Sequence, residues 1–193
     1  SGDTIQLGKG NYTLYGVSST GHTKGKDLTF VGLGADETAW NIGALVPDPA
    51  NYGTEYNGDY SFDGAGTVTF QNMISAPEGK LIGFIRADKT VVENCTINGK
   101  TFYWGYKSAT FTNTTFNCPS GDYALWTYSS PTMNFENCTF NSSGKVINVY
   151  TDYSAGKHDI FVNFINCTVN NNSIFSKQVL NVNDSNMGNY KYI

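Results

Sequence analysis

The sequence has 193 residues and carries 12 basic and 16 acidic side chains, which gives a net charge of −4 at neutral pH. Nucleic acid is not an expected partner, because the chain has a single arginine, Arg86, and nucleic-acid binding depends on clustered cations. Charged residues make up only 15% of the chain and aromatic residues another 15%, a composition that argues against disorder. No apolar run reaches the roughly 18 to 20 residues of a membrane-spanning helix, so membrane insertion is not expected either.

Strand-like sequence is found at both ends of the chain. Residues 2–14 read as a strand, a glycine-rich turn and a second strand, and residues 190–193 again resemble part of a strand. Native termini usually trail into polar residues. We therefore expect one domain, 1–193, cut from a longer polypeptide whose other domains would be among its partners.

Residues 34–66 are expected to form a long insertion loop. Four oxygen-bearing side chains lie close together there and could hold a structural calcium ion, although a plain surface loop explains them as well: Glu55, Asn57, Asp59 and Asp63. Their spacing does not match a helix-loop-helix calcium motif. No other metal or cofactor is expected.

A repeat organises the rest of the chain. Five segments share an alternation of apolar and polar residues around one asparagine, namely 68–74, 92–98, 111–117, 135–141 and 164–170, and 28–32 is an earlier copy. The repeated asparagines are Asn72, Asn94, Asn113, Asn137 and Asn166, spaced by 22, 19, 24 and 29 residues. Strand-rich repeats of this length predict a solenoid of stacked coils.

The repeated asparagine fits a corner of each coil, because asparagine tolerates the left-handed backbone conformation better than other non-glycine residues. Here the chain resembles the pectate-lyase-like superfamily, many of whose members open with a motif much like residues 2–12. The resemblance implies an all-β, right-handed parallel β-helix of about six to seven coils, with an internal asparagine ladder and long insertion loops. It implies an architecture and says little about activity.

Three cysteines follow the repeated asparagine directly: Cys95, Cys138 and Cys167. An apolar residue stands two positions after each of them, and the period of two in a strand then turns both side chains inward. We expect free thiols in a core column. Cys138 and Cys167 lie one coil apart, a distance that does not exclude a disulfide.

Asn-x-Ser/Thr triplets occur in this chain at, among other positions, Asn11, Asn94, Asn113, Asn137, Asn141, Asn166 and Asn171. In a eukaryotic secreted protein such triplets suggest N-glycosylation. Four of these asparagines belong to the predicted internal ladder, so solenoid geometry explains them without glycans. A bacterial surface origin fits this interpretation.

The clusters that active members of the resembling superfamily use, aspartates with histidine or calcium carboxylates with a basic residue, are not found in this sequence. No catalytic residue is assigned. A rival hypothesis, a polysaccharide lyase or glycoside hydrolase, would use Arg86, Asp88, Lys107, Asp152 or His158 for acid-base work. The two carboxylates in that set are about three coils, or roughly 14 Å, apart, which is far for a glycosidase pair.

A second apolar run follows each ladder segment, at 81–86, 102–106, 123–128, 146–150 and 179–183. Turning Ile85, Gly105, Thr127, Val149 and Val182 inward leaves two outward columns. One column is Phe84, Trp104, Trp126, Asn148 and Asn181, and the other is Arg86, Tyr106, Tyr128, Tyr150 and Asn183. Aromatic side chains at the strand spacing would form a ridge on which sugar rings can stack.

The aromatic columns indicate a non-catalytic carbohydrate-binding or adhesion module of a bacterial cell-surface or secreted protein. Its expected partner is a polysaccharide or a host glycan, and the expected site residues are Phe84, Arg86, Trp104, Tyr106, Trp126, Tyr128, Asn148 and Tyr150. Aromatic stacking for stability alone, or a protein-docking patch, explains the same columns. A structural stalk domain is a further alternative.

Overall fold

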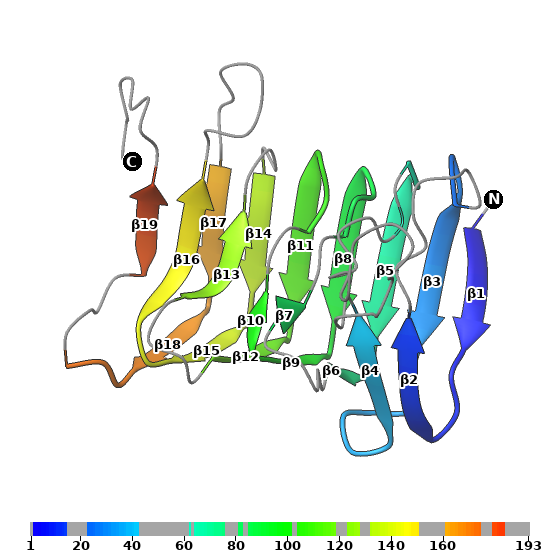
Figure 1. Cartoon of the computed structure of the whole chain (residues 1–193), viewed down its shortest axis with the longest axis horizontal. Helices are drawn as coiled ribbons and strands as arrows, with labels where there is room; N and C mark the ends of the chain where they lie inside the picture. Colours follow the sequence, from blue (N-terminus) through cyan, green and yellow to red (C-terminus); the bar gives the residue numbers. More distant parts are fainter. Residues whose placement is uncertain are drawn as a thin grey trace, which may run out of the picture.

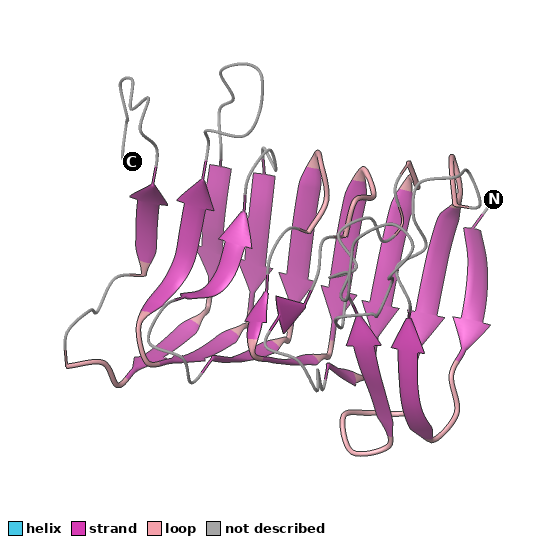
Figure 2. Cartoon of the chain, in the orientation of Figure 1, coloured by secondary structure: helices cyan, strands magenta, loops and turns pink. Residues whose placement is uncertain are grey.

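The computed structural model describes residues 2–14, 23–42, 62, 64–75, 81–82, 85–101, 104–118, 123–127, 132–150, 161–174 and 179–183. Within these ranges the chain consists of strands and connecting loops, without a helix (Figure 2). No element in the described ranges is a helix long and apolar enough to cross a membrane. The predicted all-β class is confirmed.

The strands form three parallel sheets (Figure 1). The first and second sheets extend from the first coil to the last, and the third sheet begins with β7 in the third coil. The first sheet contains β1 (Gly2–Gln6), β3 (Asp27–Val31), β5 (Thr67–Gln71), β8 (Lys89–Glu93), β11 (Ser108–Thr112), β14 (Thr132–Glu136) and β17 (Phe161–Ile165). The second contains β2 (Gly10–Leu14), β4 (Thr38–Ile42), β6 (Ile74–Ser75), β9 (Thr96–Asn98), β12 (Thr115–Cys118), β15 (Thr139–Ser142) and β18 (Thr168–Asn171). The third contains β7 (Leu81–Ile82), β10 (Lys100–Thr101), β13 (Tyr123–Thr127), β16 (Lys145–Tyr150) and β19 (Leu180–Asn183).

Each strand of the first sheet is followed along the chain by a strand of the second sheet, and from the third coil onward by one of the third sheet. Successive strands of a sheet come from successive coils and pair in parallel. This connectivity is that of a parallel β-helix, and the seven strands of the first sheet define seven coils. The number agrees with the predicted six to seven.

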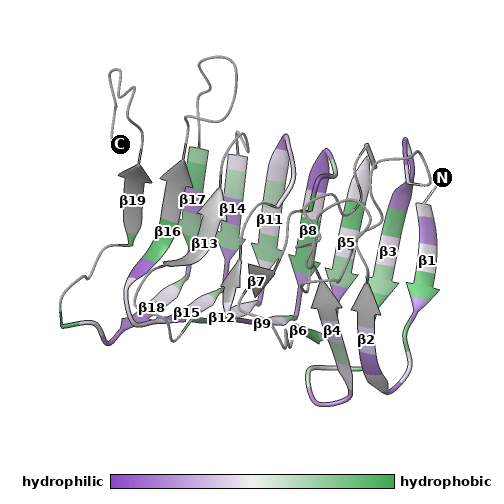
Figure 3. Ribbon diagram, viewed as in Figure 1, coloured by the Kyte–Doolittle hydropathy of each residue, from purple (hydrophilic) through white to green (hydrophobic). Residues whose placement is uncertain are grey.

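The core is a set of aromatic columns that the alternation of the strands turns inward. Figure 3 shows hydrophobic residues recurring on the strands of the first sheet. Phe111 and Phe135 of the first sheet stack with ring centres 5.0 Å apart, and Phe116 and Phe140 of the second sheet with centres 4.8 Å apart. All four are almost completely buried. These separations match the spacing of neighbouring strands, about 4.8 Å, so a column is filled by repeating one residue type in successive coils.

The segment 34–66 is not the single insertion loop that the sequence indicated. Thr38–Ile42 is strand β4 of the second sheet, and its Trp40 is 1% exposed in the core. Strand β4 pairs with β2 and β6, so it belongs to the second coil. Residues 43–61 and 63 lie outside the described part of the chain.

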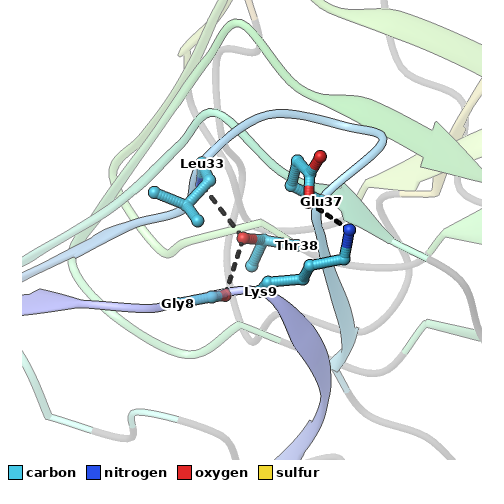
Figure 4. Close-up of polar contacts among 5 residues, drawn as sticks. All are labelled: Gly8, Lys9, Leu33, Glu37 and Thr38. Carbon is cyan, nitrogen blue, oxygen red and sulfur yellow. Dashed lines mark hydrogen bonds and ion pairs between the residues drawn. The ribbon is translucent and has the colours of Figure 1, made fainter.

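The corner between the first and second sheets takes one form in most coils. Five asparagines there adopt left-handed backbone conformations, with φ between 49° and 57°, as predicted: Asn72, Asn94, Asn113, Asn137 and Asn166. The second coil uses a different corner, in which the Thr38 hydroxyl donates to the Gly8 carbonyl and accepts from the Leu33 amide, both at 3.0 Å (Figure 4). An ion pair between Lys9 and Glu37 lies beside it (Figure 4).

The corner asparagines do not form an internal ladder. Asn94, Asn113, Asn137 and Asn166 are exposed and Asn72 is half-buried, so the expectation that these side chains point inward is wrong. The cause is alternation: the residue after each corner asparagine is turned into the core, and its neighbour therefore faces solvent. Among the described corner asparagines, one side-chain hydrogen bond joins Asn113 Nδ2 to Asn94 Oδ1, at 3.2 Å.

Candidate functional site

The third sheet carries the predicted binding face, and its last three strands have the predicted register. Trp126 pairs with Asn148, which pairs with Asn181. One residue further along these strands, Thr127 pairs with Val149 and Val149 with Val182, which is the pairing predicted for the neighbouring column. The side chains of Trp126, Asn148 and Tyr150 lie outside the described part of the structure, as do residues Phe84 and Tyr128.

Trp104 does not belong to this face. It is 1% exposed and packs against Phe70 and Phe111, at ring-centre distances of 6.3 and 5.4 Å. Ile85 bridges to Trp104 and not to Gly105, so the register in this coil differs by one residue from the predicted one. The prediction that Trp104 points outward is therefore wrong, and Trp104 is a core residue.

Gly105 explains the change of register. Its φ is 103°, and a Cβ at this position would come within 2.8 Å of the Ser108 carbonyl oxygen. Only glycine fits such a close approach without strain. The backbone therefore turns sharply at Gly105, and this turn directs the preceding tryptophan into the coil.

Arg86 and Tyr106 meet at one end of the third sheet. The Arg86 Nε donates to the Tyr106 hydroxyl, and both residues are half-buried. The guanidinium carbon lies 5.5 Å from the ring centre. Because the guanidinium contacts the hydroxyl, it lies at that edge of the ring and does not cover the ring face. The predicted proximity of these two residues is confirmed, with both side chains in adjacent coils.

Asp88 and Lys107 form an exposed ion pair beside Arg86 and Tyr106, with Lys107 Nζ 2.5 Å from Asp88 Oδ2. An exposed pair of this kind contributes about 0 to 1 kcal/mol to stability. The other residues of the enzyme hypothesis, Asp152 and His158, lie outside the described part of the chain. The described residues contain no group of three or more His, Cys, Asp or Glu that could hold a metal. The candidate calcium ligands Glu55, Asn57, Asp59 and Asp63 lie outside the described ranges.

The predicted cysteine column is present. Cys95 and Cys138 are buried, Cys167 is half-buried, and all are free thiols. Each thiol donates to carbonyl oxygens, that of Cys138 to Phe111 and Glu136, both at 3.4 Å. Burial raises the pKa of the Cys95 and Cys138 thiols from 9.0 to about 11. These protonated, buried thiols are poor nucleophiles.

A second column of asparagines, on the outer face of the second sheet, forms the longest side-chain ladder in the described residues. Asn117 Nδ2 donates to Asn98 Oδ1 at 2.9 Å, Asn141 to Asn117 at 2.8 Å, and Asn170 to Asn141 at 2.9 Å. The sequence interpretation missed this ladder, although the same asparagine closes four of the repeated segments. The repeat itself was the signal.

Comparisons with family models, with curated proteins and with solved structures found no match for this chain. The parallel sheets and the asparagine ladder are compatible with the superfamily that the sequence resembles, and the fold is established by the coils themselves.

Proposed function

We propose that the protein is a non-catalytic carbohydrate-binding module, and that the outer face of the third sheet binds a polysaccharide or host glycan. One observation carries the proposal: the column of Trp126, Asn148 and Asn181 runs in register across three coils. Parallel pairing repeats these positions at about 4.8 Å, so one aromatic side chain and two amides would line one track. An aromatic ring can stack on the apolar face of a sugar while amides bond to its hydroxyls.

The Arg86–Tyr106 pair supports a second contact zone beside the same sheet, in the connections that lead to β8 and β11. The hydrogen bond fixes the ring and the guanidinium relative to each other, which lowers the entropy lost when a ligand binds. A guanidinium is a planar, charged group with five N–H donors, a geometry that suits hydroxyl and carboxylate oxygens. We expect this pair to bind hydroxyl or carboxylate groups of the glycan.

The proposed setting is a bacterial cell-surface or secreted protein of the pectate-lyase-like superfamily, in which this module works beside other domains. The low charge of the chain and its solenoid architecture support a role at a surface, where an extended, rigid body presents a long face. Export would bring that face to external glycans.

Glycan-array binding of the wild type, Trp126→Ala and Tyr106→Ala tests the proposal. Loss of a stacked aromatic should weaken binding about tenfold, since such contacts contribute on the order of 1 kcal/mol or more. Phe161→Ala is the matched control, because Phe161 is 57% exposed but belongs to the first sheet. Equal binding by all four proteins would rule out this face.

Two alternatives predict different results. A polysaccharide lyase or glycoside hydrolase would release products from acidic or neutral polysaccharides, and Asp88→Asn with Lys107→Met would reduce that release. A structural stalk would bind no glycan and would respond to Trp126→Ala only through its free energy of unfolding. Measuring product release, binding and urea unfolding on the same variants separates the three.

A further inference from the structure

We propose that the exposed corner asparagines Asn94, Asn113, Asn137 and Asn166 are acceptor sites for N-linked glycans. Each begins an Asn-x-Thr triplet, and each is exposed at the corner between the first and second sheets. Asparagines that pointed inward, as the sequence predicted, would be inaccessible to a transferase. The structure contradicts that orientation. The third sheet is not part of this corner, so the two proposed surfaces are distinct.

The corner presents the two recognised residues of the triplet outward together. The asparagine occupies the left-handed turn, and the threonine is the first residue of the next strand of the second sheet, Thr96, Thr115, Thr139 or Thr168. Those threonines are exposed or half-buried. The middle residue, a cysteine in three coils, is turned inward. A glycan on the asparagine would therefore leave the core column undisturbed.

Hydrogen bonding separates these sites from other triplets. Asn137 and Asn166 make no side-chain hydrogen bond with any described residue, and Asn94 and Asn113 share one long bond. Asn141, by contrast, is a central member of the ladder, where it both donates and accepts.

Asn171 is also engaged. Its Nδ2 donates to the Gly144 carbonyl at 2.6 Å, and its Oδ1 accepts from the Ser173 amide at 2.9 Å. A glycan at Asn141 or Asn171 would have to displace such contacts. The folded chain thus tolerates a glycan at a corner asparagine better than at Asn141 or Asn171.

The reaction is a glycosyl transfer from a polyprenyl-pyrophosphate oligosaccharide, catalysed by a membrane-bound oligosaccharyltransferase. The asparagine Nδ2 forms a bond to C1 of the first sugar, and the bond between C1 and the pyrophosphate oxygen breaks. The lipid pyrophosphate leaves with the electron pair, and one amide proton passes to a base of the transferase. The nitrogen keeps one N–H, so a modified Asn113 could still donate to Asn94.

The modification rests on the exported setting of the proposed function and further requires that the exporting cell carries an oligosaccharyltransferase. It does not depend on a bacterial origin or on glycan binding by the third sheet. The test secretes the chain from eukaryotic cells and locates glycans by mass spectrometry of glycopeptides. We expect glycans on peptides containing the four corner asparagines. Asn72 is an internal control, because its corner has the same backbone conformation but Ile74 replaces the threonine.

Two substitutions at one corner sharpen the test. Thr139→Ala should abolish the glycan at Asn137, and Thr139→Ser should retain it. Asn137→Gly removes the acceptor and keeps the left-handed turn, so it gives the signal of an unmodified corner in a folded chain. The proposal is overturned if all four corner peptides are unmodified while a co-secreted glycoprotein is modified, or if glycans occur only at Asn141 and Asn171. Glycan-array binding, measured separately, shows whether the third-sheet proposal stands or fails on its own.

Discussion

Two columns of asparagine run along the solenoid, four residues apart in each repeat, and they stabilise it in different ways. In the corner column, represented by Asn137, the backbone φ is 54° and the side chain is exposed. In the strand column, represented by Asn141, the backbone is extended and the side chain bonds to asparagines in both neighbouring coils. The first column uses the backbone tolerance of asparagine, and the second uses its amide group.

The difference predicts opposite tolerance to substitution. Glycine satisfies the corner because it adopts positive φ without cost, but it weakens a strand. Valine suits a strand and is strained at positive φ. The same pair of substitutions at the two columns should therefore give reversed orders of stability.

The largest expected change in the free energy of unfolding comes from alkaline pH. The corner turns the residue after its asparagine into the core, and Cys95 and Cys138 are buried in this way. Burial raises the pKa of the Cys95 and Cys138 thiols from 9.0 in the unfolded reference to about 11. As pH rises through this window, the unfolded chain loses thiol protons that the folded chain keeps, so the free energy of unfolding falls. The fall approaches roughly 2 to 3 kcal/mol per thiol, and urea unfolding at several pH values measures it.

Thr114 suggests the control for this experiment. It occupies the cysteine position in its own coil, and its hydroxyl donates to the Thr112 carbonyl at 3.0 Å. A Cys95→Thr, Cys138→Thr variant should keep such a bond and lose the thiol titration. Its stability should depend less on pH than that of the wild type over this window, and parallel pH profiles would contradict the assignment.

At the corner, Asn137→Val should lower the free energy of unfolding by about 2 kcal/mol, because a β-branched residue must adopt a left-handed conformation. Asn137→Gly should change it by less than about 0.5 kcal/mol. Thermal or urea unfolding of the two variants gives the comparison. If valine is tolerated as well as glycine, the corner does not depend on positive φ.

In the strand column, Asn141→Val should lower the free energy of unfolding by about 1 kcal/mol. The variant loses the half-exposed hydrogen bonds of the ladder, and the strand preference of valine offsets part of that loss. Asn141→Gly should cost more than valine, because it loses the same bonds and also loosens the strand. The order of valine and glycine is thus reversed relative to Asn137. The same order at both positions would show that the two columns do not differ in the proposed way.

Much of this arrangement could be predicted from the sequence, because a solenoid repeats the same pattern of strands, corners and inward residues in successive coils. The five corner asparagines and the inward cysteines follow from a repeated asparagine and a period of two. The same period also requires that a residue next to an inward Cys138 face outward. The internal ladder implied by the resemblance conflicted with that requirement, and the alternation was correct.

Trp104 could not be placed by alignment of repeats. The backbone φ at Gly105 is 103°, and Ile85 pairs with Trp104 instead of Gly105. A shift of one residue reverses which side chains face inward. A lone glycine in an apolar run was the available signal for an irregular strand. In this part of the third sheet the strands β7 and β10 have only two residues each, so little regular pairing fixes the register.

The smallest expected effect tests the direction of the strand-column ladder. Each bond runs from the Nδ2 of one coil to the Oδ1 of the preceding coil, so Asn98 only accepts and Asn170 only donates within the ladder. Asn98→Asp keeps the acceptor and should leave the free energy of unfolding almost unchanged. Asn170→Asp replaces the donor by a second acceptor opposite the Asn141 oxygen, and should cost about 0.5 to 1 kcal/mol more. The difference between the two variants measures the polarity of the ladder, and a larger cost at Asn98 would mean that the amides point the other way.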